Sequence, residues 1–128
     1  MTALLDTHAL LFWVYEPDRL ARGAKSAIAD RRSRLLWSVA STWDAAIKVG
    51  LGKLRLDRSL DEVLSEELPR QAIEVLPIVQ EHALRVASLP RYHGDPFDRR
   101  LVAQALVERV PLITVDGWAA RYGAEVIW

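Results

Sequence analysis

The sequence predicts a three-layer α/β/α domain built on a central, mainly parallel, twisted sheet of four to five strands. Two observations support this prediction. Short apolar runs alternate along the chain with segments of helical spacing, a pattern typical of α/β layer structures. The first run, Ala3–Leu5, is apolar at every position, which is typical of a strand at the centre of a sheet that is covered on both faces.

Length and composition limit the class of protein. At 128 residues the chain is long enough for one domain, residues 1–128, and too short for two ordinary ones. A hydrophobic content of 51% is typical of a globular chain, and the absence of cysteine excludes disulfides, thiolate chemistry and sulfur-ligated zinc. Because no apolar run approaches the roughly 18 residues of a membrane-spanning helix, we expect a soluble, cytoplasmic protein with no membrane partner.

In the first half of the chain, the strand Ala3–Leu5 leads into a largely apolar helix that Pro17 ends. A second helix is predicted at Ala21–Ala29 and a second strand at Leu35–Trp37. The residues Ser38–Ser41 then turn into a third helix, in which Trp43, Ala46 and Ile47 form one face and which Gly50–Gly52 ends.

In the second half, Leu60, Val63, Leu64 and Leu68 recur at helical spacing, and Phe97, Leu101, Val102, Ala105 and Leu106 do the same after Pro96. Pro96 suits a first helical position and Asp95 an N-cap. The remaining predicted elements are the strands Ile73–Leu76, Val110–Val115 and Ala124–Ile127 and the helices Glu81–Ala87 and Trp118–Tyr122.

Four carboxylates stand where strands meet helices. Asp6 and Asp116 follow strands, and Asp44 and Asp98 lie in the first turns of helices. Two of them also suit ordinary structural roles: Asp98 suits a helix dipole, and Asp44 suits a capping box with Ser41 and an ion pair with Lys48. Because ligands bind beyond the carboxyl ends of parallel strands, all four acids can also face one pocket.

Four carboxylates in one pocket require a compensating positive charge. An all-oxygen site selects Mg²⁺, with Mn²⁺ as a second option, and such ions promote phosphodiester cleavage by water. The sequence therefore predicts a nuclease. The net charge of zero means that RNA must be held by the metal and by local cations, for which the candidates are Arg99, Arg100, Arg91, Lys48 and Lys53.

Four stretches carry a resemblance to a known family: Leu4–Leu11, Ser41–Leu54, Asp95–Arg99 with Ala103–Ala105, and Leu112–Asp116. In this order they resemble the PIN-domain ribonucleases, and specifically the VapC toxins of bacterial type II toxin–antitoxin modules. The resemblance assigns the metal ligands to Asp6, Asp98 and Asp116 and the hydroxyl position nearby to Thr114. It places Asp44, as the fourth catalytic acid, where the family usually carries glutamate.

The resemblance further implies a Mg²⁺-dependent endoribonuclease that cleaves transfer or ribosomal RNA. It also implies a homodimer and a VapB-type antitoxin whose segment blocks the acidic pocket. Trp13, Trp43 and Trp118 are candidates for lining an antitoxin groove, although a core position is the more common role of such residues. Asp95 is either a cap or a ligand, and His8 is left out of the catalytic set.

Two alternatives remain open from the sequence. An aspartate-based phosphotransfer enzyme also gathers acids at strand ends, but that chemistry needs a second acid two residues after Asp6, where His8 stands. The other alternative is a catalytically weak or inactive PIN-fold module that binds RNA or protein, which the departure at Asp44 keeps open. His82 is interpreted as an exposed or capping residue, since no second histidine stands four residues later.

Overall fold

The computed structural model describes residues 1–91 and 96–128, apart from the side chains of Pro96 and Phe97. Its centre is a five-stranded sheet with the order β3-β2-β1-β4-β5, in which every neighbouring pair is parallel. The strands are β1 (Thr2–Leu5), β2 (Arg34–Ser38), β3 (Ile73–Leu76), β4 (Leu112–Ile113) and β5 (Val126–Ile127). The predicted parallel sheet is confirmed, with β1 at its centre.

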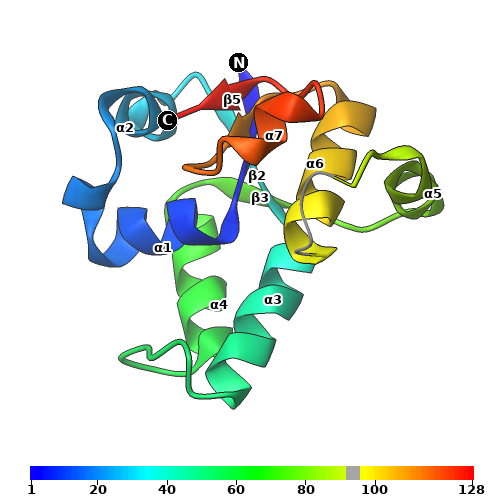
Figure 1. The fold of residues 1–128 in the computed structure, drawn as a ribbon. Helices are drawn as coiled ribbons and strands as arrows, with labels where there is room; N and C mark the ends of the chain where they lie inside the picture. Colours follow the sequence, from blue (N-terminus) through cyan, green and yellow to red (C-terminus); the bar gives the residue numbers. More distant parts are fainter. Residues whose placement is uncertain (92–95) are drawn as a thin grey trace.

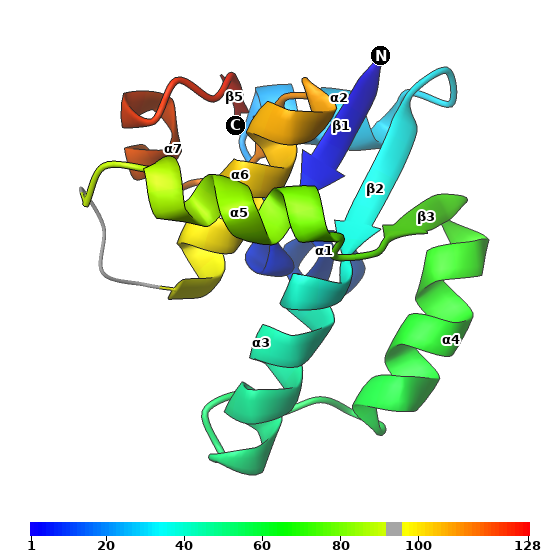
Figure 2. The same ribbon diagram turned by 90° about the vertical axis from the view of Figure 1, so that its right-hand side faces the viewer.

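The helices are α1 (Thr7–Tyr15), α2 (Arg22–Ala29), α3 (Val39–Gly50), α4 (Leu60–Arg70), α5 (Gln80–Ser88), α6 (Pro96–Glu108) and α7 (Trp118–Arg121), with a 3₁₀ turn at Pro17–Arg19. Strands β1 and β2 point toward the same edge of the sheet, and α1 and α3 begin there (Figures 1 and 2). None of the helices in the described ranges is long and apolar enough to cross a membrane.

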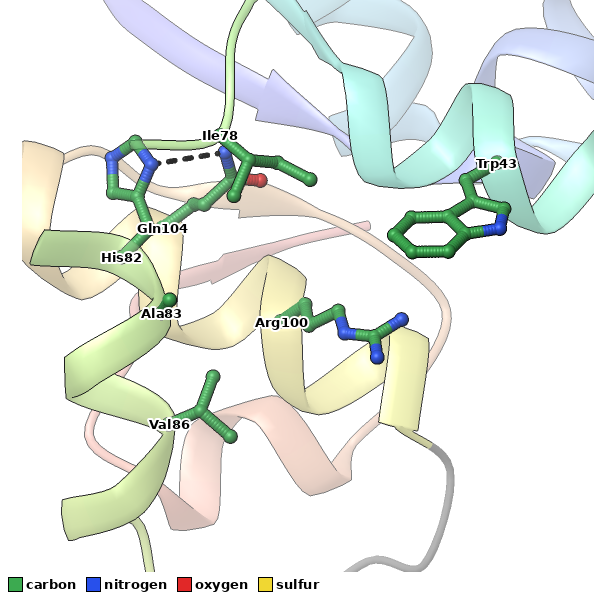
Figure 3. A pocket seen from close by; sticks show the side chains of 7 residues that line it. All are labelled: Trp43, Ile78, His82, Ala83, Val86, Arg100 and Gln104. Atoms are coloured by element: carbon green, nitrogen blue, oxygen red, sulfur yellow. Dashed lines mark hydrogen bonds between the residues drawn. The ribbon is translucent and has the colours of Figure 1, made fainter. Parts of the chain in front are cut away.

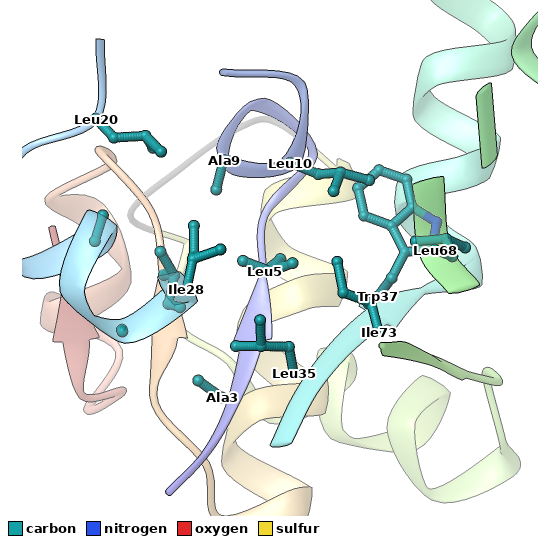
Figure 4. Packing of buried hydrophobic residues seen from close by; sticks show 13 residues of the cluster. Ala3, Leu5, Ala9, Leu10, Leu20, Ile28, Leu35, Trp37, Leu68 and Ile73 are labelled. Atoms are coloured by element: carbon teal, nitrogen blue, oxygen red, sulfur yellow. The ribbon is translucent and has the colours of Figure 1, made fainter. Parts of the chain in front are cut away.

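Side chains of β1 alternate between two hydrophobic clusters, one on each face of the sheet. Ala3 and Leu5 pack with residues of α1, α2 and α4, together with Trp37 of β2 (Figure 4). Leu4 packs on the opposite face with α6, α7 and the first turn of α3. Because successive side chains of a strand point to opposite faces, an all-apolar β1 fills both clusters, and the α/β/α arrangement follows.

Helix α3 begins three residues earlier than the sequence predicts. Ser38 is the N-cap, since its hydroxyl oxygen accepts a hydrogen bond from the Ala40 backbone N–H at 2.9 Å. Ser41 is therefore inside the helix and buried, so the predicted capping box with Asp44 is wrong. The residues Ser38 and Ser41 are equally suited to capping, and only the end of β2 at Ser38 decides between them.

Gly23 in α2 lies against the main chain of the last residue. A Cβ atom built on Gly23 would collide with the Trp128 carbonyl oxygen, whereas one on Gly50 would have no neighbour within 4 Å. We expect Gly23→Ala to lower the free energy of unfolding by about 1–3 kcal/mol, because backbone has to move, and Gly50→Ala to be neutral or slightly stabilising. Urea unfolding of the two variants measures this; equal midpoints would contradict it.

Candidate metal centre

Asp6 follows β1 directly and is the N-cap of α1. Its Oδ1 accepts hydrogen bonds from the backbone N–H groups of His8 at 2.6 Å and Ala9 at 3.2 Å. The side chain is buried, with 8% of the residue exposed. Asp6 therefore caps α1 through Oδ1, which leaves its second oxygen, Oδ2, for another partner.

Thr114, just after β4, connects two of the predicted acids. Its buried hydroxyl donates a hydrogen bond to Asp6 Oδ2 and accepts one from the Asp116 backbone N–H at 3.0 Å. Asp116 Oδ1 in turn accepts from the Trp118 N–H at 2.9 Å, at the start of α7. The Thr114 hydroxyl thus holds the side chain of Asp6 and the main chain of Asp116 in one arrangement.

We expect Thr114→Val to lower the free energy of unfolding by about 1–3 kcal/mol, because the Asp116 N–H loses its buried acceptor. Thr114→Ser keeps the hydroxyl and should stay within about 1 kcal/mol of the wild type. Chemical denaturation of both variants measures the difference. If valine and serine are tolerated equally, the bridge has no energetic role.

One small cavity, of about 10 Å³, brings three of the predicted acids together. It is lined by Asp6, Asp98, Leu101, Val102, Leu112, Thr114, Asp116 and Ala119. Asp98 reaches it from the first turn of α6, as the sequence predicts. Asp6 after β1, Asp98 in α6 and Asp116 after β4 therefore meet at the carboxyl edge of the sheet, although Asp6 and Asp116 are 110 positions apart in sequence.

The donors in this cavity suit a hard divalent cation. Carboxylate and hydroxyl oxygens are the ligands that Mg²⁺ and Mn²⁺ prefer, and the described residues of the lining contribute neither sulfur nor imidazole. Within the described residues, no group of three or more acidic, histidine or cysteine side chains is arranged so that it could hold a metal ion by itself. Mg²⁺ is commonly held by one or two carboxylates together with waters and substrate phosphates, and an open acidic cavity fits that mode.

Asp44 takes a different place. It lies in the second turn of α3, is 8% exposed, and is not among the described residues that line the acidic cavity. Its Oδ2 accepts a hydrogen bond from Lys48 Nζ at 3.1 Å. The predicted ion pair is confirmed, and Asp44 is beyond the first turn because the helix begins at Val39 rather than after Ser41.

The two candidate arginines of α6 differ in their surroundings. Arg99 donates from its guanidinium to the carbonyl oxygens of Leu89, at 3.2 Å, and Val86, at 3.4 Å. It therefore ties the end of α5 to α6. Arg100 lies over the Trp43 ring, with its guanidinium carbon 5.3 Å from the ring centre. The two arginines therefore contact different neighbours, Arg99 the end of α5 and Arg100 a side chain of α3. Asp95 is outside the described residues.

Arg100 and Trp43 also border a larger cavity of about 360 Å³ between α3, α5 and α6 (Figure 3). Trp43 is 54% exposed and Trp118 is 40% exposed, so a core position is wrong for both of these tryptophans. Trp13 is partly buried and packs against the first hydrophobic cluster. Helical spacing alone does not distinguish a face turned to the core from one turned to solvent when both are apolar.

His82, on the opposite side of this larger cavity from Trp43, is the third residue of α5, and its side chain caps the N-terminus of that helix (Figure 3). Its Nδ1 accepts a hydrogen bond from the Val79 N–H at 3.1 Å, and its Nε2 lies 2.8 Å from Glu108 Oε2. The predicted capping role is confirmed, but the predicted exposure is wrong, since only 3% of the residue is accessible. Gln104, also buried, contacts the same ring and accepts from Ser38. No sequence signal indicated this polar network.

The fold and the acidic cavity are those of an α/β protein that gathers carboxylates at the carboxyl edge of a parallel sheet. The PIN domain family model matches residues 3–125, so the chain belongs to the PIN family. PIN domains are generally nucleases and typically use divalent metal ions. No curated protein matches the sequence.

Solved structures with a similar fold come from toxin–antitoxin complexes. VapBC2 from Rickettsia felis, bound to a promoter DNA fragment, aligns with a TM-score of 0.73 at 13% identity, covering 98% of this chain and 97% of that chain. FitAcB from Neisseria gonorrhoeae aligns with a TM-score of 0.64 at 20% identity, covering 97% of this chain and 95% of that chain. VapBC-1 from nontypeable Haemophilus influenzae aligns with a TM-score of 0.61 at 18% identity, covering 98% of this chain and 96% of that chain. At these identities the likeness is one of fold.

Proposed function

We propose that this chain is a divalent-metal-dependent endoribonuclease toxin of a VapBC-type toxin–antitoxin pair, acting as a single PIN domain in the cytoplasm. The observation that carries the proposal is the cavity where Asp6, Asp98 and Asp116 meet Thr114 in a chain of the PIN family. Transfer or ribosomal RNA is the proposed substrate and Mg²⁺ the proposed ion, with Mn²⁺ as a substitute.

Each residue at the cavity has a distinct part in the proposed reaction. Asp6, Asp98 and Asp116 would hold the cation, which when bound supplies a Lewis acid for the attack of water on the phosphodiester and for the charge on the leaving oxygen. Thr114 keeps Asp6 in position through its hydroxyl. Arg100 supplies a positive charge for the RNA backbone, which a chain of zero net charge must provide locally.

The direct test is cleavage of purified transfer and ribosomal RNA by the purified chain. We expect cleavage with Mg²⁺ or Mn²⁺, loss of cleavage with EDTA, and recovery when the metal is restored. Cleavage that survives the chelator would contradict the metal mechanism. RNA that binds but stays intact under all metal conditions would instead identify a catalytically inactive binding module.

The proposed partners are a VapB-type antitoxin and a second copy of the chain. The likeness to complexes with VapB and FitA chains supports the antitoxin, whose segment would occupy the acidic cavity. Co-purification with the product of a small neighbouring reading frame tests this partner, and we expect the complex to lose RNA cleavage. A neighbouring product that neither binds nor inhibits would contradict the toxin assignment while leaving the nuclease in place.

A further inference from the structure

Asp44, the fourth of the predicted acids, has its counter-charge in Lys48. Asp44 is buried, and burying a carboxylate costs free energy unless a positive charge and hydrogen-bond donors lie beside it. Lys48 provides both, with Nζ at 3.1 Å from Oδ2 and the lysine one helical turn after the aspartate. This order, with the acid first, is the favourable one for such a pair.

A divalent cation at Asp44 would compete with this ammonium group. Two positive charges on one carboxylate repel, so the metal could bind there only if Lys48 moved away. The aspartate side chain is also one methylene shorter than glutamate, and Asp44 is absent from the described lining of the cavity that holds Asp6, Asp98 and Asp116. Charge, side-chain length and position therefore all argue against Asp44 as a metal ligand.

From these contacts, and resting on the proposed function, we infer that Lys48 supplies at Asp44 the positive charge that a second metal ion would otherwise supply. Asp44 is then not a metal ligand, and the centre binds one divalent cation, at Asp6, Asp98 and Asp116. Lys48 is a positioning residue, since it holds Asp44 and is not among the described residues that line the acidic cavity.

Calorimetric titration of the whole chain with Mn²⁺ alone tests this inference without an activity assay. We expect the wild type to bind one ion and Asp44→Asn to bind one ion with an affinity within about threefold, since a change of that size is under 1 kcal/mol. In Lys48→Met the buried Asp44 carboxylate loses its counter-charge, and we expect a second, weaker binding event to appear.

Two matched variants control for charge and folding. Lys48→Arg keeps the charge on α3, and Lys53→Met removes a charge from the exposed chain after α3; both should bind one ion. Thermal melts show whether each variant is folded. Two ions on the wild type, one of them lost in Asp44→Asn, would overturn the inference and leave the proposed nuclease intact. An unchanged single event in folded Lys48→Met would remove the role of Lys48, and no Mn²⁺ binding at all would overturn the metal centre itself.

Discussion

Replacing Asp6 by asparagine is expected to lower the rate of metal-dependent RNA cleavage by at least about a hundredfold. Mutations that only support metal ligands typically cost about 10–100-fold, so loss of a direct ligand should cost more. Asparagine is as good an N-cap as aspartate, so the bonds from His8 and Ala9 can persist and the fold should be retained. Initial rates on a labelled RNA at saturating Mn²⁺ measure the loss.

The matched control is Asp18→Asn, which removes a carboxylate from the exposed 3₁₀ turn at Pro17–Arg19. We expect this variant to cleave RNA like the wild type. Circular dichroism and a thermal melt establish that Asp6→Asn is folded. If the folded Asp6→Asn enzyme keeps more than half of the wild-type rate, Asp6 is a helix cap and nothing else.

The largest expected effect on stability comes from Trp37 on β2. Its side chain is 1% exposed, packs in the cluster with Leu5 and Leu10, and donates from its indole N–H to the Thr42 hydroxyl at 2.8 Å. Trp37→Ala should therefore lower the free energy of unfolding by about 3–5 kcal/mol, which is a large part of the stability of a small domain. Urea denaturation followed by circular dichroism measures it.

Trp43→Ala provides the comparison, because it makes the same substitution at a side chain that is 54% exposed. We expect a change under about 1 kcal/mol, since the substitution leaves no core cavity. Equal losses at Trp37 and Trp43 would contradict the assignment of one tryptophan to the core and the other to the surface of α3.

The layers of this fold can be predicted from the sequence because a central parallel strand, buried on both faces, is a continuous run of apolar residues. All three residues of Ala3–Leu5 are apolar, so the side chains on both faces of the strand are buried. This pattern alone predicts that β1 lies between two helical layers. The position of Asp6 can also be predicted, because an acid between a buried parallel strand and an apolar helix lies at the edge of the sheet where ligands bind. Thr114 and Asp98 followed from the family resemblance together with their position.

Other features depend on contacts between distant residues. The start of α3 is decided by where β2 ends, since Ser38 and Ser41 suit a cap equally. The burial of His82 depends on Glu108 and Gln104, which are more than 20 positions away. The ion pair of Asp44 with Lys48 was predicted from their spacing, but only the structure shows that Asp44 is not among the described residues that line the acidic cavity.

The central claim is that folding brings Asp6, Asp98 and Asp116 together around one hard cation. Crystals of the chain grown or soaked with Mn²⁺, with anomalous diffraction measured near the manganese edge, test this most directly. The predicted result is one anomalous peak in the cavity, with oxygens of Asp6 and at least one of the other two aspartates at about 2.0–2.3 Å. A well-ordered cavity without that peak, or a peak held by Asp44 instead, would contradict the claim.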